Sequence, residues 1–225
     1  IALANQIDEL CTTAQVNSRE IISLANHHPR IHILEPGPGV GGHCIAVDPH
    51  FLINEFPKET EIFALARKVN SARPLLTLNR IIAALNGMRH KSPNRKLSIG
   101  IWGLAFKPNV DDMRESPALD IARHLIALND PHITFHAVEP HVHPSIIQEM
   151  GFTAEADPER SLDLSDGIIV LVKHKAFKEV DHSLLAQKVV YDACGLVYEI
   201  EKNDVAPDSF IFGKTTAQTT VKQSV

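Results

Sequence analysis

The chain has 225 residues, of which 44% are hydrophobic, and it carries a formal net charge of -5 at pH 7. This length can enclose the core of one or two domains, and the negative balance excludes the basic surface that nucleic acid requires. No apolar run approaches the roughly 20 residues that span a bilayer and no leader peptide is visible, so we expect no membrane partner. The three widely spaced cysteines form neither a disulfide framework nor a paired metal motif, which fits the reducing cytoplasm.

Residues 1–90 are predicted to form helices around a single loop. Apolar residues recur at helical spacing from Ile1 to Ala14, and a short helix is expected from Arg19 to Asn26, behind the capping pair Asn17 and Glu20. Because the helical pattern already includes the first residue, we expect further chain before it.

A longer amphipathic helix is expected from about Glu59, with an interruption at Pro74 and the same apolar period resuming to about Met88. Its apolar face, from Glu61 to Leu85, can pack on a second copy of the chain or on the chain's own C-terminal part. We expect the first arrangement, a homodimer built on these central helices.

The pattern changes after residue 90 to alternating strands and helices. The segment from Lys91 to Arg95 is typical of a polar hinge. The expected strands are Leu97–Leu104, Ile133–Val138, Gly167–Val172 and Val189–Tyr191, with a helix over Pro117–Leu128. The fold class is therefore α/β: an all-helical central dimerisation region over 1–90, then a Rossmann-like, doubly wound parallel sheet over 91–203. Residues 204–225 are polar and without period, and we expect a poorly ordered tail.

The segment from Pro36 to Asp48 carries the strongest sign of chemistry. Its glycines leave backbone amides open to the oxygens of a ligand, and its two prolines restrict the loop. Cys44 offers a nucleophilic sulfur, and Asp48 would stand one turn away if the segment is helical, where it can position water or take a proton. The alternative is an ordinary turn that contains a packed cysteine.

Other motifs give weaker signals. The strand end at Gly100–Ala105 resembles a dinucleotide-binding fingerprint but lacks its close glycine pair. Lys107 and Arg114 follow it, and two cations near a helix start suit phosphate oxygens, with a solvated loop as the alternative. His43 beside Cys44 suggests a Cys/His hydrolase, which we set aside because adjacent residues generally point apart.

A metal site is not expected. His136, Glu139, His141 and His143 carry zinc-binding groups at close spacing. This segment lies at a strand end and crosses a proline, where exposed histidines are common, so we favour exposed side chains without a metal.

Two long motifs resemble a known family. One comprises the segments from Pro36 to Phe51 and from Leu65 to Asn70, and the other runs from Gly103 to Pro117. Both motifs, in this order, are similar to the UDP-glucose/GDP-mannose dehydrogenase family, over its central and C-terminal parts.

The resemblance implies oxidation of the C6 alcohol of a UDP-sugar to a carboxylate, in two hydride transfers to NAD, for a surface polysaccharide pathway. Cys44 would trap the intermediate aldehyde as a thiohemiacetal and then carry a thioester, and Asp48 would orient or deprotonate the groups around the hydrolytic water. Arg114 would contact the cofactor, while Asp111 and Asp112 would brace its loop. UDP-sugar contacts are implied for His28, Arg30, Gly41, Phe106 and Lys107, the first two across a dimer interface in some members.

The resemblance also limits what is expected of this chain. The NAD-binding domain and a catalytic Lys and Asn of the family precede the matched region, so we expect no turnover by these 225 residues alone. His50 and Cys194 stand where relatives often carry a large aromatic and a basic residue, which leaves the sugar and part of the cofactor contact open. UDP-N-acetylmannosamine is the expected substrate, with UDP-glucose and UDP-N-acetylglucosamine as alternatives. The competing class is a non-catalytic module for sugar-nucleotide binding and dimerisation.

Overall fold

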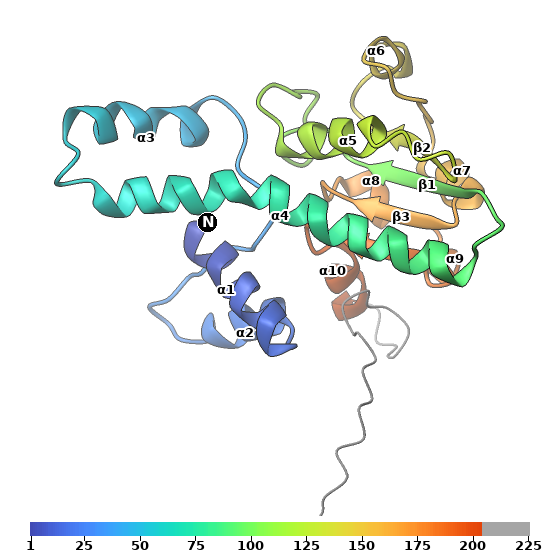
Figure 1. Ribbon diagram of the computed structural model, residues 1–225. Coiled ribbons are helices and arrows are strands. Elements are labelled where there is room, and N and C mark those ends of the chain that lie inside the picture. Colours follow the sequence, from blue (N-terminus) through green and yellow to red (C-terminus); the bar gives the residue numbers. More distant parts are fainter. Residues whose placement is uncertain (204–225) are drawn as a thin grey trace, which may run out of the picture.

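The computed structural model describes residues 1–203. Its first part is helical and consists of α1 Ala2–Ala14, α2 Ser18–Ala25, α3 Cys44–Glu55 and α4 Glu61–Lys91 (Figure 1). Asn17 caps α2 as predicted, because its side-chain oxygen accepts hydrogen bonds from the amides of Arg19 and Glu20. The tail expected over 204–225 lies outside the described residues.

Helix α4 is one continuous helix of 31 residues, so the predicted interruption at Pro74 is wrong. Proline lacks an N–H and removes one bond to the carbonyl of Asn70, four residues earlier. The helix nevertheless continues, because Asn70, Arg73, Thr77 and Leu78 are buried around the proline and tertiary packing outweighs the lost bond. No helix within residues 1–203, α4 included, has the length and apolar character needed to cross a bilayer.

The second part is built on four parallel strands in the order β2-β1-β3-β4. These are β1 Leu97–Trp102, β2 Ile133–Val138, β3 Gly167–Val170 and β4 Val189–Asp192. The chain leaves β1 toward one edge and returns to the other side of it, so the switch point of the sheet lies between the carboxyl ends of β1 and β3. The intervening helices are α5 Pro117–Ala127, α6 Pro144–Glu149, α7 Pro158–Leu164, α8 Lys175–Lys178, α9 His182–Leu185 and α10 Leu196–Asn203.

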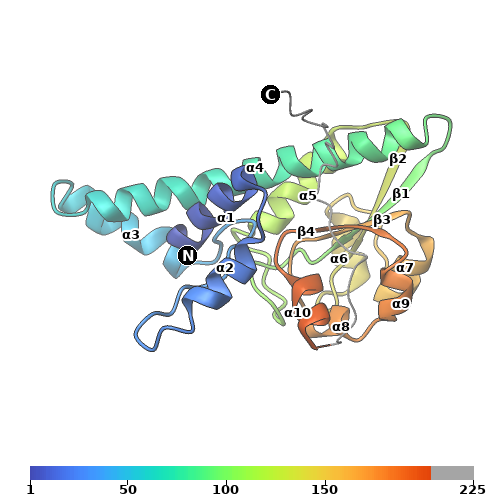
Figure 2. The same cartoon turned by 90° about the horizontal axis from the view of Figure 1, so that it is seen from below.

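Two hydrophobic cores cover the two faces of the sheet, and they follow the alternation along each strand. Ile99 and Ile101 of β1 join one core with Leu78, Ile81 and other residues of α4 and α5. Trp102 joins the other core, where its ring stacks on Phe177 of α8 at 4.9 Å between centroids. Figure 2 shows the sheet between α4 and α5 on one side and α7 to α10 on the other. The expected doubly wound α/β class is confirmed.

Helix α3 and the first half of α4 run side by side and extend beyond the sheet (Figure 1). We call residues 44–75 the α3–α4 arm. None of the residues of α3 is buried, although the helix is rich in apolar side chains. The apolar face of α4 was expected to pack either on a second copy or on the chain's own C-terminal part. The C-terminal half of α4 packs on the chain's own sheet, whereas its N-terminal half leaves apolar side chains exposed.

Candidate active site

Cys44 is the first residue of α3, directly after the glycine-rich loop, and its side chain is exposed. Asp48 lies one turn further along the same helix and is also exposed. The sequence places Asp48 one turn from Cys44 only if this segment is helical, and the structure shows that it is. Cys44 therefore lies at the amino end of the helix, where the helix dipole has its positive end.

Helix α3 contains Pro49, which cannot donate an amide hydrogen to the carbonyl of Ile45. Arg67 of α4 supplies a replacement, because its Nη1 donates to the Ile45 oxygen at 3.4 Å. The contact joins the helix that carries the cysteine to the central helix.

The glycine loop packs on the loop that follows β1, and two glycines make the approach possible. A Cβ atom on Gly41 would lie 2.3 Å from the carbonyl oxygen of Glu115 and 2.9 Å from Cβ of Phe106. Gly42 has a φ of +80° and faces the Phe106 ring, where an added Cβ would lie 2.8 Å from Cε2. Two of the residues expected to contact substrate, Gly41 and Phe106, are thereby brought together, and Gly41 precedes Cys44 by three positions in the sequence.

Residues that the sequence argument missed hold the start of this loop. Asn5 of α1 accepts a hydrogen bond from the Gly37 amide at 3.0 Å, and Arg73 of α4 donates through Nε to the Gly37 carbonyl at 3.1 Å. Asn5 is itself fixed by Asn70, whose side-chain oxygen accepts from its Nδ2 at 3.0 Å. The available signal was a polar side chain on an otherwise apolar helical face, because a buried polar group needs a partner.

Lys107 and Arg114 lie in the loop after β1, as expected, but they are engaged differently. The Lys107 ammonium lies 5.3 Å from the centre of the Phe106 ring, a cation–π contact. The Arg114 guanidinium donates twice to Asp112, at 2.9 and 2.7 Å. These hydrogen bonds hold the pKa of the Asp112 carboxyl well below its usual range. The backbone oxygen of Asp112 also accepts from the Phe106 amide, so this residue braces the loop.

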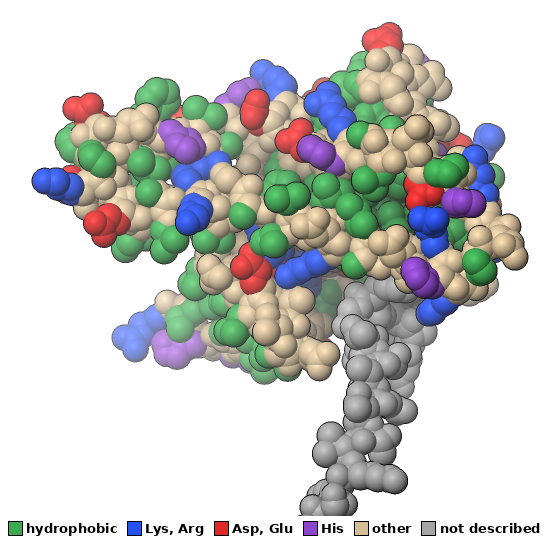
Figure 3. Space-filling model, in the orientation of Figure 1, with side chains coloured by type: hydrophobic (Ala, Val, Ile, Leu, Met, Phe, Trp, Pro, Cys, Tyr) green, Lys and Arg blue, Asp and Glu red, His purple; other side chains and the backbone are tan. Residues whose placement is uncertain are grey.

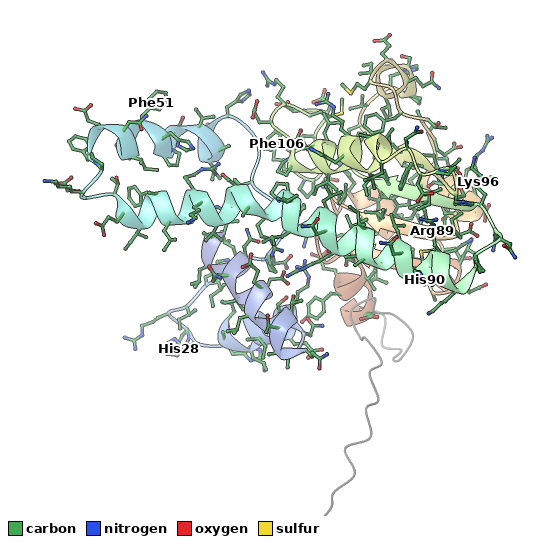
Figure 4. All side chains as sticks on the ribbon, viewed as in Figure 1. His28, Phe51, Arg89, His90, Lys96 and Phe106 are labelled. Atoms are coloured by element: carbon green, nitrogen blue, oxygen red, sulfur yellow. The ribbon has the colours of Figure 1, made fainter. Side chains whose placement is uncertain are left out.

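His28 and Arg30 lie elsewhere in the molecule. They form a short exposed turn after α2, where the Arg30 amide donates to Nδ1 of His28 at 3.3 Å. Figure 4 shows His28 well separated from Phe106. One chain therefore does not unite all of the expected substrate contacts.

The two remaining cysteines differ from Cys44. Burial raises the pKa of the Cys11 thiol, and Asp8 raises it further. Burial likewise raises the pKa of the Cys194 thiol well above its usual value. Cys194 packs in the core that contains Trp102. It is therefore not exposed at the position where relatives often carry a basic residue.

The segment of closely spaced histidines departs from expectation. His136 and Glu139 are buried, whereas His141 and His143 are exposed. Nε2 of His136 lies 2.9 Å from Oγ of Ser161, and Glu139 points instead toward the loop after β1. Within residues 1–203, no group of three or more His, Cys, Asp or Glu side chains is arranged to hold a metal ion.

The parallel sheet with its switch point, joined to a helical part that presents a cysteine, defines a protein of the Rossmann-like α/β class. Residues 1–72 match the central domain of the UDP-glucose/GDP-mannose dehydrogenase family, and residues 100–199 match its UDP binding domain. The chain belongs to this family.

Its relatives include sugar-nucleotide dehydrogenases of bacteria and archaea. UDP-N-acetyl-D-mannosamine dehydrogenase of Escherichia coli (strain K12) is 40% identical over 198 residues, which cover 87% of this chain and 47% of that protein. NDP-N-acetyl-D-galactosaminuronic acid dehydrogenase of Ralstonia nicotianae is 40% identical over 198 residues, with 87% and 44% covered. The structure of UDP-D-ManNAc dehydrogenase from Pyrococcus horikoshii superposes with a TM-score of 0.70 at 30% identity, over 87% of this chain and 44% of that one. The chain spans about half the length of the curated relatives that it matches.

Proposed function

We propose that the chain is the central and C-terminal part of an NAD-dependent UDP-N-acetyl-D-mannosamine 6-dehydrogenase that works in the cytoplasm for a surface polysaccharide pathway. The observation that carries the proposal is an exposed Cys44 at the start of α3, next to a glycine loop that packs on Phe106. The similarity to UDP-N-acetyl-D-mannosamine dehydrogenases supports the substrate.

In the proposed reaction, the Cys44 sulfur acts on the bound UDP-sugar. The C6 alcohol first loses a hydride and a proton, which gives an aldehyde. The Cys44 thiol adds to this carbonyl: a carbon–sulfur bond forms, and the oxygen takes the thiol proton to give a thiohemiacetal. Loss of a second hydride and of the hydroxyl proton leaves a thioester.

Water then attacks the thioester, the carbon–sulfur bond breaks and the sulfur regains a proton, which leaves the uronate. Asp48, one turn from Cys44 on the same helix face, would orient this water or accept its proton. The glycine loop, fixed by Asn5 and Arg73, would present the sugar to the sulfur.

NAD, when bound, supplies the acceptor for each hydride. Arg114 is the residue of this chain that would hold it. A guanidinium has five N–H donors, and Asp112 takes two of those of Arg114, so an exposed side chain retains donors for a phosphate oxygen. We do not expect these 225 residues to turn over alone, because the family's NAD-binding domain precedes the matched region.

The UDP-sugar would bind through Phe106 and Lys107, and we propose a homodimer in which His28 and Arg30 of one copy reach the sugar held by the other. The separation of His28 from Phe106 within one chain supports a contribution from a second copy. Figure 3 shows hydrophobic side chains spread over the α3–α4 arm, which supports this arm as the contact surface. The competing function is a sugar-nucleotide-binding and dimerisation module in which the sulfur does no chemistry.

Thiol labelling with and without ligand tests the proposal. Cys11 and Cys194 are buried, so faster labelling of Cys44 is expected from exposure alone and does not separate the two functions. Saturating UDP-N-acetylmannosamine is expected to slow the labelling of Cys44 several-fold, read out by peptide mass spectrometry, because the bound sugar covers the sulfur.

ATP at the same concentration serves as the control and should leave the Cys44 rate unchanged. Binding of the UDP-sugar, measured by calorimetry, with no protection of Cys44 would favour the binding module.

A further inference from the structure

We propose that Glu139 and His174 are positioning residues that hold the loop 104–109 in the shape that presses Phe106 against the glycine loop. Glu139 directly follows β2, and its Oε2 accepts hydrogen bonds from the amides of Leu104 at 2.7 Å and Ala105 at 2.9 Å. His174 follows β3, and its Nδ1 accepts from the amide of Asn109 at 3.0 Å. Both ends of the loop that carries Phe106 and Lys107 are thus fixed by side chains that follow the neighbouring strands β2 and β3.

The two side chains form one unit. Nε2 of His174 lies 3.1 Å from Oε2 of Glu139, and neither side chain has solvent exposure. Because Nδ1 of His174 accepts a backbone N–H, the ring proton lies on Nε2 and is donated to the carboxylate. Burial raises the pKa of Glu139, but the hydrogen bonds from His174 and the two amides outweigh burial and leave it lower than usual. The pair therefore consists of a neutral imidazole and an ionised carboxylate whose donors all come from the protein.

The packing around His174 leaves this geometry little freedom. The Phe177 ring meets the imidazole edge-on at 5.3 Å, and the side chain of Asn109 accepts the amide of Lys175 at 2.8 Å. Asn109 itself has a φ of +60°, a conformation that must be held by its neighbours.

The function of the Glu139–His174 pair follows from the position of the amides that it binds. In a dinucleotide-binding fold, the loop after the first strand offers its N–H groups to the phosphates of the ligand. Here a carboxylate of the protein already holds the amides of Leu104 and Ala105, so these two N–H groups are not available to a ligand phosphate. The loop is consequently set before any ligand arrives, and the sugar nucleotide meets a preformed Phe106 and Lys107.

Three variants separate the contacts, and the identity of the ligand rests on the proposed function. E139Q replaces one acceptor oxygen by a donor. H174Q carries its amide at about the position of Nε2, so it can still offer an N–H to Glu139, but its oxygen does not lie where Nδ1 accepts from Asn109. H174N carries its amide at about the position of Nδ1, so it can offer an oxygen to Asn109 but does not reach Glu139. E179Q, on the exposed end of α8, removes a carboxylate without touching the loop and is the control.

Two measurements on the 225-residue chain test the inference: residue-resolved amide hydrogen exchange and calorimetric titration with UDP, both at a temperature where circular dichroism shows each variant folded. E139Q is expected to speed exchange at Leu104 and Ala105, and H174Q at Asn109, by roughly tenfold or more. UDP should bind roughly tenfold more weakly to E139Q, and E179Q should match the unaltered chain.

Unchanged exchange at these three amides would overturn the inference, and so would faster exchange with an unchanged UDP affinity, which indicates a purely structural pair. If E139Q does not fold, the two His174 variants carry the test, because each keeps one of the two hydrogen bonds that His174 makes to Asn109 and Glu139. An unaltered chain that does not bind UDP would overturn the proposed function, and the exchange rates alone would then decide whether the pair holds the loop.

Discussion

At the scale of single residues, the candidate site depends as much on absent side chains as on present ones. The glycine loop and Phe106 come close because Gly41 and Gly42 have no Cβ atoms to separate the two loops. Gly37 belongs to the same loop but faces open space, and its role is carried by its backbone amide and carbonyl. Glycines that look alike in the sequence therefore have different structural roles.

Gly41→Ala tests this difference. The new methyl group would meet the backbone oxygen of Glu115 at 2.3 Å, and backbone cannot rotate away as a side chain can, so the two loops must separate. We expect the free energy of unfolding to fall by about 1–3 kcal/mol in urea titrations, as for an overpacked site.

Gly37→Ala is the matched control, because no atom lies within 4 Å of its added Cβ. Its free energy of unfolding is expected to change by less than about 0.5 kcal/mol, or to rise slightly through the lower entropy of the unfolded chain. Equal losses in both variants would show that the contact with Glu115 is not the reason Gly41 is required.

At the scale of elements, α1 and α4 are joined by a partly buried ionic cluster. Asp8 of α1 accepts hydrogen bonds from Arg73 and Arg80 of α4, each at 2.9 Å, and from Ser18 at 2.7 Å. Burial raises the pKa of Asp8, but these donors outweigh burial and leave it below its ordinary value of 3.8. Arg73 also holds the glycine loop, so the cluster links helix packing to the candidate site.

Asp8→Asn is expected to lower the free energy of unfolding by about 2–4 kcal/mol at pH 7, because it removes the carboxylate that Arg73 and Arg80 share. A carboxyl whose folded-state pKa is lowered stabilises the fold fully above its ordinary pKa, and this contribution is lost as the pH falls through the lower value. The difference between the two proteins in urea titrations should therefore stay constant above about pH 5 and shrink below pH 3.8.

Asp163→Asn, an exposed carboxylate at the end of α7, provides the control and should have little effect at either pH. A difference between Asp8→Asn and the unaltered chain that grows toward low pH would contradict the assigned direction of the shift.

At the scale of the whole molecule, the α3–α4 arm exposes several large apolar side chains. Ile45, Phe51, Phe56, Ile62 and Leu65 are all exposed, and Phe51, on the outer side of α3 in Figure 4, is 70% exposed. Several large apolar side chains exposed on one element indicate a contact with another protein. The proposed occupant is a second copy of the chain.

Light scattering at micromolar concentration is expected to give twice the mass of one 24.8 kDa chain. Phe51→Glu should shift the protein to monomers, because a charge would be buried in the contact. Ile146→Glu places the same charge on α6, outside the arm, and should leave the dimer intact. A monomer in the unaltered chain, or dissociation by both variants alike, would count against the arm as the interface.

Much of the fold was predictable from local pattern. The strand limits at Ile133–Val138, the proline at the start of α5 and the cap at Asn17 depend on side-chain periodicity and on residues that favour one backbone conformation. Pro74 shows the limit of such reasoning, because local propensity favoured a break and packing around Asn70 and Arg73 kept one helix.

For the site, the sequence by itself determined the candidate residues: a cysteine at the end of a glycine loop, and Phe106 and Lys107 after a strand. Only the tertiary structure decided which residues meet. Asn5 and Arg73 hold the glycine loop, Glu139 and His174 hold the loop of Phe106, and the two loops close on each other through Gly41. The physical reason is that these contacts join residues 32 to 74 positions apart in the sequence. A hydrogen bond or a missing Cβ at such a separation leaves no periodic pattern in the chain.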